Sequence, residues 1–147
     1  MALLKSRSLT VSINLDPKTV YEFIFNLENL FKWASKAFQS IKQVKGEWIA
    51  ETAQGSTKIS LTQKNDFGVL DHYVRLPSLG VEVYVPMRVV HNGINGSKVI
   101  FTLFYTTHMS EENFTQDVRM VEKDLKNLKS YHRRRELILS GGNRGTI

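Results

Sequence analysis

Residues 67–90, FGVLDHYVRLPSLGVEVYVPMRVV, predict two antiparallel strands joined by a turn over residues 76–80. If Arg75 lies opposite Glu82, the apolar side chains gather on one face, because side chains along a strand alternate between the two faces of a sheet. A shift of one residue would carry the charged side chains into the core, so the register is well determined. The apolar face then consists of Leu70, His72, Val74, Val83, Val85 and Met87.

The opposite face of this pair is polar and aromatic, with Asp71, Tyr73, Arg75, Glu82, Tyr84 and Arg88. Its simplest interpretation is a solvated surface with a cross-strand ion pair of little energetic weight. A tyrosine and arginine face can also stack bases or anchor a partner protein. A protein-interaction adaptor using this face therefore stays open as an alternative.

The length of 147 residues and the hydrophobic content of 41% predict a single domain over residues 1–139, followed by a flexible C-terminal tail over residues 140–147. The chain has no cysteine, which excludes disulfides, thiolate zinc sites and cysteine nucleophiles. The short apolar run at the N-terminus does not resemble a signal peptide, and no later stretch approaches a membrane span. We therefore expect a cytoplasmic protein.

The net charge of +6 comes largely from the C-terminal region, including the run Arg133, Arg134 and Arg135. Basic residues in the last turn of a helix interact favourably with the helix dipole, so we interpret this run as a solvated helix end rather than a nucleic-acid or membrane surface. His91, His108 and His132 fall on different predicted elements without ligand-like spacing, so we expect no metal site.

Local signals predict the remaining elements. After a strand over residues 8–14, Asp16 and Pro17 predict the start of a helix over residues 17–27, and a second short helix follows near Trp33. The other expected strands cover residues 38–45, 47–53, 57–64 and 98–107, and a turn at Gln54 and Gly55 would place Glu51 opposite Lys58. A long helix from Ser110 to about Leu137 carries one apolar stripe, formed by Phe114, Val118, Val121, Leu125 and Leu128.

The expected fold is therefore α+β, with a curved seven-stranded antiparallel sheet, two short helices after the first strand and a long C-terminal helix that packs on the apolar face of the sheet. This order resembles the helix-grip fold of the START-like or SRPBCC superfamily, in its polyketide cyclase/dehydrase-like branch. The stretches that carry the resemblance are DPKTVYEFIFNLENLFKW at 16–33, FGVLDHYV at 67–74, YVPMRVV at 84–90 and VEKDLKNL at 121–128.

The resemblance spans residues 8–137, although many relatives have a proline where this chain has Phe31. It implies a deep apolar cavity between the curved sheet and the long helix. Across the superfamily such cavities hold lipids, sterols, polyketides, quinones or hormones.

His72 is the only ionisable side chain that the register places on the inner face of the sheet. Burial favours its neutral form, which suits a general base or a hydrogen-bonding anchor for a ligand. The alternative is a core histidine paired with Tyr105 or with a buried water. Asp71 cannot orient the ring, because adjacent strand residues point to opposite faces.

Large side chains are also expected to face inward, and each of them either packs the core or lines a ligand pocket: Trp33, Trp48, Met87, Phe101 and Tyr105. Gln63 and Thr57 are the other expected polar contacts to a ligand. Phe31 and Trp33 are candidates for an entrance lid.

Three functions remain open from the sequence. The first is binding of a small hydrophobic molecule, of lipid, polyketide or quinone type, with His72 as its polar contact and no cofactor. The second is a polyketide cyclase or dehydrase in which His72 moves a proton. The third is the adaptor. Function depends on the site and not on the fold, so the resemblance does not choose among them.

Overall fold

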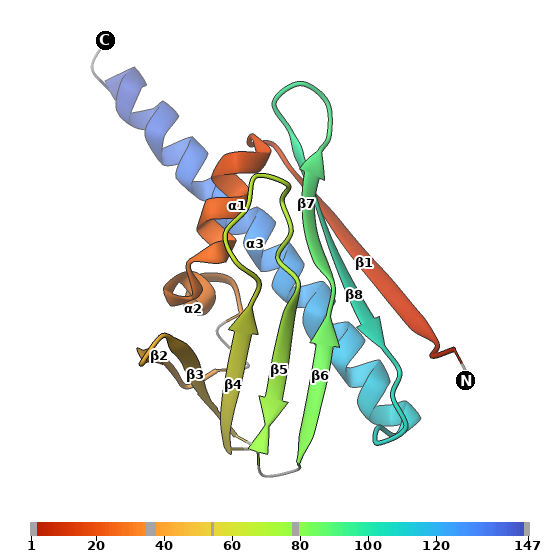
Figure 1. The fold of residues 1–147 in the computed structure, drawn as a ribbon. Helices are drawn as coiled ribbons and strands as arrows, with labels where there is room; N and C mark the ends of the chain where they lie inside the picture. The colour runs from red at the N-terminus through yellow and green to blue at the C-terminus, as the bar shows by residue number, and fades with distance from the viewer. Residues whose placement is uncertain (1–2, 35–37, 54, 78–79, 146–147) are drawn as a thin grey trace.

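The computed structural model describes residues 3–34, 38–53, 55–77 and 80–145, with side chains up to residue 135. Strand β1 (Ser6–Ile13) precedes helix α1 (Pro17–Phe25), the 3-10 turn η1 (Leu27–Asn29) and helix α2 (Leu30–Trp33). Helix α3 (Glu111–Gly145) ends the described chain and runs diagonally behind the strands in Figure 1. The strands between are β2 (Ser40–Val44), β3 (Glu47–Thr52), β4 (Gly55–Leu61), β5 (His72–Leu76), β6 (Val81–Val85), β7 (Met87–His91) and β8 (Ser97–Phe104).

The prediction of one seven-stranded sheet was wrong. The described strands form a three-stranded sheet in the order β1-β8-β7 and a five-stranded sheet in the order β2-β3-β4-β5-β6. The predicted sixth strand is divided at Pro86, which has no backbone N–H to donate and a fixed φ. The Pro86 carbonyl accepts a hydrogen bond from the Thr102 amide at 3.0 Å, so β8 becomes a pairing partner of the chain from there on. A bridge between Val69 and Arg88 continues the register of β5 and β6 on the other side of β7.

The register of β5 and β6 is confirmed: Arg75 lies opposite Glu82, and His72 lies opposite Val85. The register of β3 and β4 was predicted wrongly. Glu51 lies opposite Ser56 and not Lys58, because β3 ends at Thr52 and β4 begins at Gly55, so the turn comes one residue earlier than expected. Residues 54 and 78–79, in the two predicted turns, lie outside the described residues.

The caps explain where the helices begin and end. Asp16 accepts hydrogen bonds from the Thr19 amide at 3.0 Å and the Thr19 hydroxyl at 2.7 Å, and Pro17 is the first helical residue, as predicted. Helix α1 ends at Phe25 rather than residue 27, because Asn26 leaves the helical conformation and caps η1 instead.

Helix α3 begins after Ser110, whose hydroxyl accepts the Asn113 amide at 3.0 Å. It continues past residue 137, where we expected its end, to Gly145, and so covers most of the segment 140–147 predicted as a tail. Residues 146–147 lie outside the described part.

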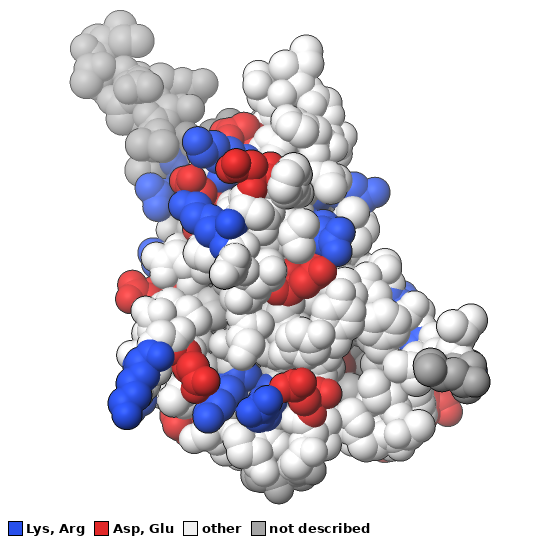
Figure 2. All heavy atoms as spheres, viewed as in Figure 1, with Lys and Arg blue, Asp and Glu red and all other residues white. Residues whose placement is uncertain are grey.

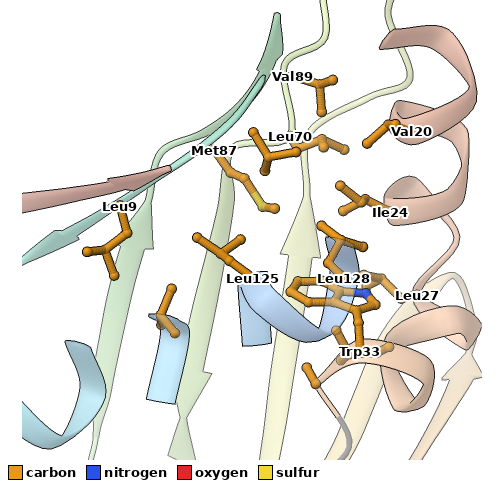
Figure 3. Packing of buried hydrophobic residues seen from close by; sticks show 14 of the residues in the cluster. Leu9, Val20, Ile24, Leu27, Trp33, Leu70, Met87, Val89, Leu125 and Leu128 are labelled. Carbon is orange, nitrogen blue, oxygen red and sulfur yellow. The ribbon is translucent and has the colours of Figure 1, made fainter. Parts of the chain in front are cut away.

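The core lies where α1, η1 and α2 meet α3 and the strands of the smaller sheet (Figure 3). Val20, Leu70, Val99 and Leu128 have almost no exposed surface. The predicted apolar stripe of α3 is buried at Val118, Val121, Leu125 and Leu128. Helix α3 and the strands, each apolar on one face, therefore bury each other's apolar surface, as the amphipathic patterns predicted.

A loop over residues 62–71 connects β4 to β5 and sets the position of His72. Asn65 organises this loop: its side-chain oxygen accepts the amides of Phe67 at 3.0 Å and Val69 at 3.1 Å, and its amide nitrogen donates to the carbonyls of Gln63 and Val69. The backbone amide of Asn65 donates to the buried Tyr21 hydroxyl at 3.0 Å, which ties the loop to α1.

Gly68 brings the same loop against β7. It has a φ of +73°, and its carbonyl accepts the Val89 amide at 2.9 Å. A Cβ at this position would collide with the Val89 carbonyl oxygen. Gly46 has a similar φ of +83° but no neighbouring atom within 4 Å of such a Cβ.

We predict that Gly68→Ala lowers the free energy of unfolding by about 2–4 kcal/mol, because it adds a backbone clash to an unfavourable φ. Gly46→Ala, the matched control, should cost about 1 kcal/mol, the cost of the φ alone. Urea unfolding followed by fluorescence measures both values. Equal losses in the two variants would show that the contact between loop and strand is not tight.

Candidate functional site

A cavity of about 620 Å³ lies between the five-stranded sheet, the segment from α1 to α2, and α3. Most of its wall is apolar. Strands β4 to β8 contribute Ile59, Leu61, Val74, Leu76, Val83, Val85, Met87, Phe101 and Leu103. The α1–α2 segment contributes Ile24, Leu27, Leu30, Trp33 and Ala34. The implied cavity between sheet and helix is therefore present.

Of the predicted site residues, Trp33, His72, Met87 and Phe101 line this cavity. Trp33 is 6% exposed and Met87 2% exposed, so both also belong to the core. Phe31, the other candidate for a lid, is half-buried and is not part of the cavity wall.

The other predicted residues lie elsewhere. Trp48 and Gln63 line a separate hollow beside α1, which Phe25 and Gln43 share. Tyr105 packs its ring on Phe114, with 5.0 Å between ring centroids. These three side chains were placed in the cavity by strand alternation alone. Gln63 and Tyr105, however, lie beyond the ends of β4 and β8, and alternation does not show that Trp48 on β3 faces the other hollow.

His72 lies on the inner face, as predicted, with its ring half-buried. Nδ1 lies 2.9 Å from the Leu70 carbonyl oxygen. A carbonyl only accepts, so Nδ1 carries the hydrogen and Nε2 of the neutral ring is an acceptor. Among the described residues no hydrogen bond reaches Nε2, and the ring contacts Phe101 edge to face at 6.1 Å. The proposed partner Tyr105 is not bonded to it.

Burial lowers the pKa of His72 below its ordinary value, and the bond to Leu70 and the charge of Asp71 oppose this shift without reversing it. The ring is therefore neutral in the folded protein at pH 7. A neutral imidazole with a free Nε2 can accept a hydrogen bond or a proton from a molecule in the cavity.

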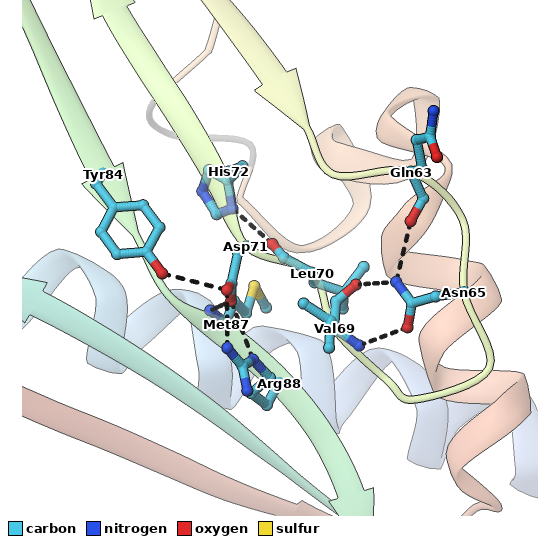
Figure 4. A network of polar contacts seen from close by, with 9 residues as sticks. All are labelled: Gln63, Asn65, Val69, Leu70, Asp71, His72, Tyr84, Met87 and Arg88. Atoms are coloured by element: carbon cyan, nitrogen blue, oxygen red, sulfur yellow. Dashed lines mark hydrogen bonds and ion pairs between the residues drawn. The ribbon is translucent and has the colours of Figure 1, made fainter.

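Asp71 points to the opposite face, as expected, and holds the junction at Pro86 together (Figure 4). Its carboxylate accepts from Arg88 at 2.8 and 3.1 Å, from the Met87 amide at 2.9 Å and from the Tyr84 hydroxyl at 3.2 Å. The bonds to Arg88 lower the pKa of Asp71. This network fixes the strands on either side of Pro86, and so positions Met87 and His72 at the cavity wall.

Sequence reasoning missed the face of α3 that lines the cavity. Asn113, Gln116, Asp117, Met120, Val121 and Asp124 recur at helical spacing and all face it. Asp124 is only 8% exposed, and burial raises its pKa to about 6. Burial also raises the pKa of Asp117. The signal was available: Asp117 and Asp124 directly precede Val118 and Leu125, so both flank the buried stripe rather than lying opposite it.

The outer face of the larger sheet is a mixed polar surface. Tyr73 and Tyr84 are exposed and contact each other, with 5.3 Å between ring centroids, and Arg75 pairs with Glu82 at 2.8 Å. On the face shown in Figure 2, basic side chains lie among acidic ones and do not form a patch of one sign.

Two features are absent from the described residues. They contain no group of three or more His, Cys, Asp or Glu side chains arranged to hold a metal ion. None of their helices is long and apolar enough to cross a membrane.

The fold matches several solved structures. XoxI from Bacillus cereus aligns with a TM-score of 0.72 at 17% identity, covering 90% of this chain and 99% of that one. A START superfamily protein from Mycobacterium smegmatis aligns with a TM-score of 0.68 at 9% identity, covering 88% and 97%. DynU16, a protein of the dynemicin biosynthetic locus, aligns with a TM-score of 0.65 at 11% identity, covering 86% of this chain and 46% of that one.

No family model matches the chain, and no curated protein is similar to it in sequence. At these low identities the structural matches define the fold alone. The chain has the START/SRPBCC-like helix-grip fold, as its sequence resemblance implied. Its function has to be argued from the cavity.

We predict that the imidazole of His72 titrates by NMR with a pKa below 6.5, its ordinary value, because burial disfavours the charged ring. The unfolded chain then binds a proton more readily than the folded one, so this histidine makes the free energy of unfolding fall as the pH drops below 6.5. His72→Gln identifies the resonance and should remove this part of the pH dependence. A pKa at or above the ordinary value would contradict the buried, neutral ring.

Proposed function

We propose that the protein binds a small, mainly apolar molecule in the cavity between the five-stranded sheet and α3, with His72 as a polar contact. The observation that carries the proposal is the cavity itself. Part of its wall, at Asn113, Gln116 and Met120, is exposed, so the cavity opens to solvent and a molecule can enter it. A space of about 620 Å³ lies within the range of roughly 300–1,000 Å³ that small-molecule sites occupy.

The composition of the wall supports the same proposal. Ligand sites combine apolar surface with a few polar groups that orient the ligand. Here aliphatic side chains and Phe101 form the apolar surface, and His72 Nε2 and the carboxyl of Asp124 supply acceptors without a partner among the described residues. The matched proteins include a START superfamily member, which is consistent with this use of the fold.

One observation favours an enzyme as the second candidate. A neutral imidazole whose Nε2 lines an apolar cavity is the arrangement that a general base requires. In that case His72 would take a proton from a polyketide-like substrate. His72→Gln separates the two candidates: a carrier loses affinity only, whereas an enzyme keeps its ligand and loses turnover.

The adaptor is less well supported. Apart from Tyr73, the polar groups of the outer face are paired with one another, in the network around Asp71 and in the bond between Arg75 and Glu82. Exposed ion pairs of this kind contribute little to binding a partner.

A variant that fills the cavity tests the proposal. Val83, half-buried, lines the cavity from β6, whereas Val90 is exposed on β7 and lies outside it. We predict that Val83→Trp lowers the affinity for a neutral naphthylamine dye by roughly tenfold or more, because the indole occupies the ligand's space. Val90→Trp, the matched control, should leave the affinity unchanged.

Native mass spectrometry of the protein purified from its own host should also show a bound molecule, lost in Val83→Trp and kept in Val90→Trp. Dye binding that is equal in both variants and the parent would place the dye outside the cavity. That result, with no bound molecule in the native spectrum, would overturn the proposal.

A further inference from the structure

The charge of the cavity wall is opposite to that of the chain. The chain has 20 Lys and Arg residues and a net charge of +6. No Lys or Arg is among the described residues that line the cavity, although two carboxyl groups are. The polar and ionisable lining residues are His72, His108, Asn113, Gln116, Asp117 and Asp124. The excess of basic side chains therefore lies outside the cavity, and the ionised groups of the cavity wall are acidic.

Asp124 is the most deeply buried of these groups. Its residue is 8% exposed, and its carboxyl makes no hydrogen bond or ion pair with another described side chain. The neighbouring Lys123 acts on it only through its charge. A buried carboxylate without a partner is costly, and the cost falls when a cation or strong donor reaches it. No described residue that lines the cavity supplies that group, so a bound molecule is the source we consider.

The other inner groups also accept rather than donate. Nδ1 of His72 donates its hydrogen to the Leu70 carbonyl, so the neutral ring offers a ligand only the acceptor Nε2. Asp117 lies two helical turns from Asp124, about 10 Å along α3, and is half-buried. The donors of the wall, the amides of Asn113 and Gln116 and the ring of His108, are exposed at or just before the first turns of α3. A ligand carboxylate deep in the cavity would face two like charges at low dielectric.

We propose that the cavity takes an apolar molecule that carries a protonated amine, with the ammonium group paired to Asp124 and the hydrocarbon part against the wall formed by the sheet. This rests on the proposed function and narrows it to a class of ligand. His72 Nε2 then accepts from a second donor on the ligand, such as a hydroxyl, and carboxylic acids are excluded.

Three probes with the same hydrocarbon chain test the charge preference: decylamine, decanol and decanoic acid. Each displaces the naphthylamine dye at pH 7.5, below its micelle-forming concentration. We expect the amine to bind roughly tenfold or more tightly than the acid, with the alcohol between them. Non-specific attraction to a chain of net charge +6 favours the acid, so preference for the amine reports on the cavity.

Two variants test whether Asp124 supplies the negative charge that binds the amine. Asp124→Asn keeps the size of the side chain and removes its charge. It should lower the affinity for decylamine roughly tenfold and leave the affinity for decanol unchanged. Glu112→Gln is the matched control: Glu112 is exposed on the same helix and does not line the cavity, so all three affinities should stay as in the parent.

Each of the other outcomes contradicts one part of the proposal. If decanoic acid or decanol binds as tightly as decylamine, the cationic ligand is wrong and the proposed cavity binding stands. If the amine preference survives Asp124→Asn, the assignment to Asp124 is wrong. If no probe displaces the dye from the parent protein, the proposed function fails together with this inference.

Discussion

The arrangement depends on the change of backbone pairing at Pro86. Because proline cannot donate to a sheet, the ladder between β5 and β6 is interrupted there, and β7 gains β8 as a partner. Backbone bonds from Leu70 to Met87 and from Val89 to Gly68 still tie β7 to the loop before β5. The Asp71 carboxylate spans the break, bonding the Met87 amide and the Arg88 guanidinium. A charged group thus accepts the Met87 amide, beside the backbone bonds that join Leu70 to Met87 and Val89 to Gly68. The two sheets it joins wrap around α3 instead of forming one flat layer.

This wrapping leaves space that the side chains do not fill. Because side chains alternate along the chain, Asp71 points outward to the junction and His72 inward to the cavity. Two neighbouring residues therefore have different roles: Asp71 stabilises the fold, and His72 lines the site. Helix α3 also has two roles. Its stripe at Val118, Leu125 and Leu128 is buried in the core, while the flank with Asp117 and Asp124 lines the cavity.

The sequence predicted features that depend on local periodicity. The alternation in residues 67–90 predicted the register of β5 with β6 and the inward position of His72, and the Asp16-Pro17 pair predicted the start of α1. The resemblance to START-like proteins predicted the cavity, which no local sequence pattern indicates. The division of the sheet was also foreseeable, since a proline inside an apolar run argues against a continuous central strand.

Other features depend on the curvature of the assembled sheets. Trp48 and Gln63 have the right alternation but lie beyond the bend, in another hollow. Glu51 was paired wrongly because a one-residue change in turn position moves every partner on the strand. No role was predicted for Asp117 and Asp124, because a helical pattern does not show that a cavity lies beside its flank.

The central claim is that the space between the larger sheet and α3 is a binding site and not a packing defect. A crystal structure of the protein purified from its own host tests it most directly. The account predicts continuous density for a bound molecule against Val83 and Phe101, within hydrogen-bonding distance of His72 Nε2. A cavity closed by its own side chains, with Phe101 and Met120 turned into the space and no molecule present, would contradict it.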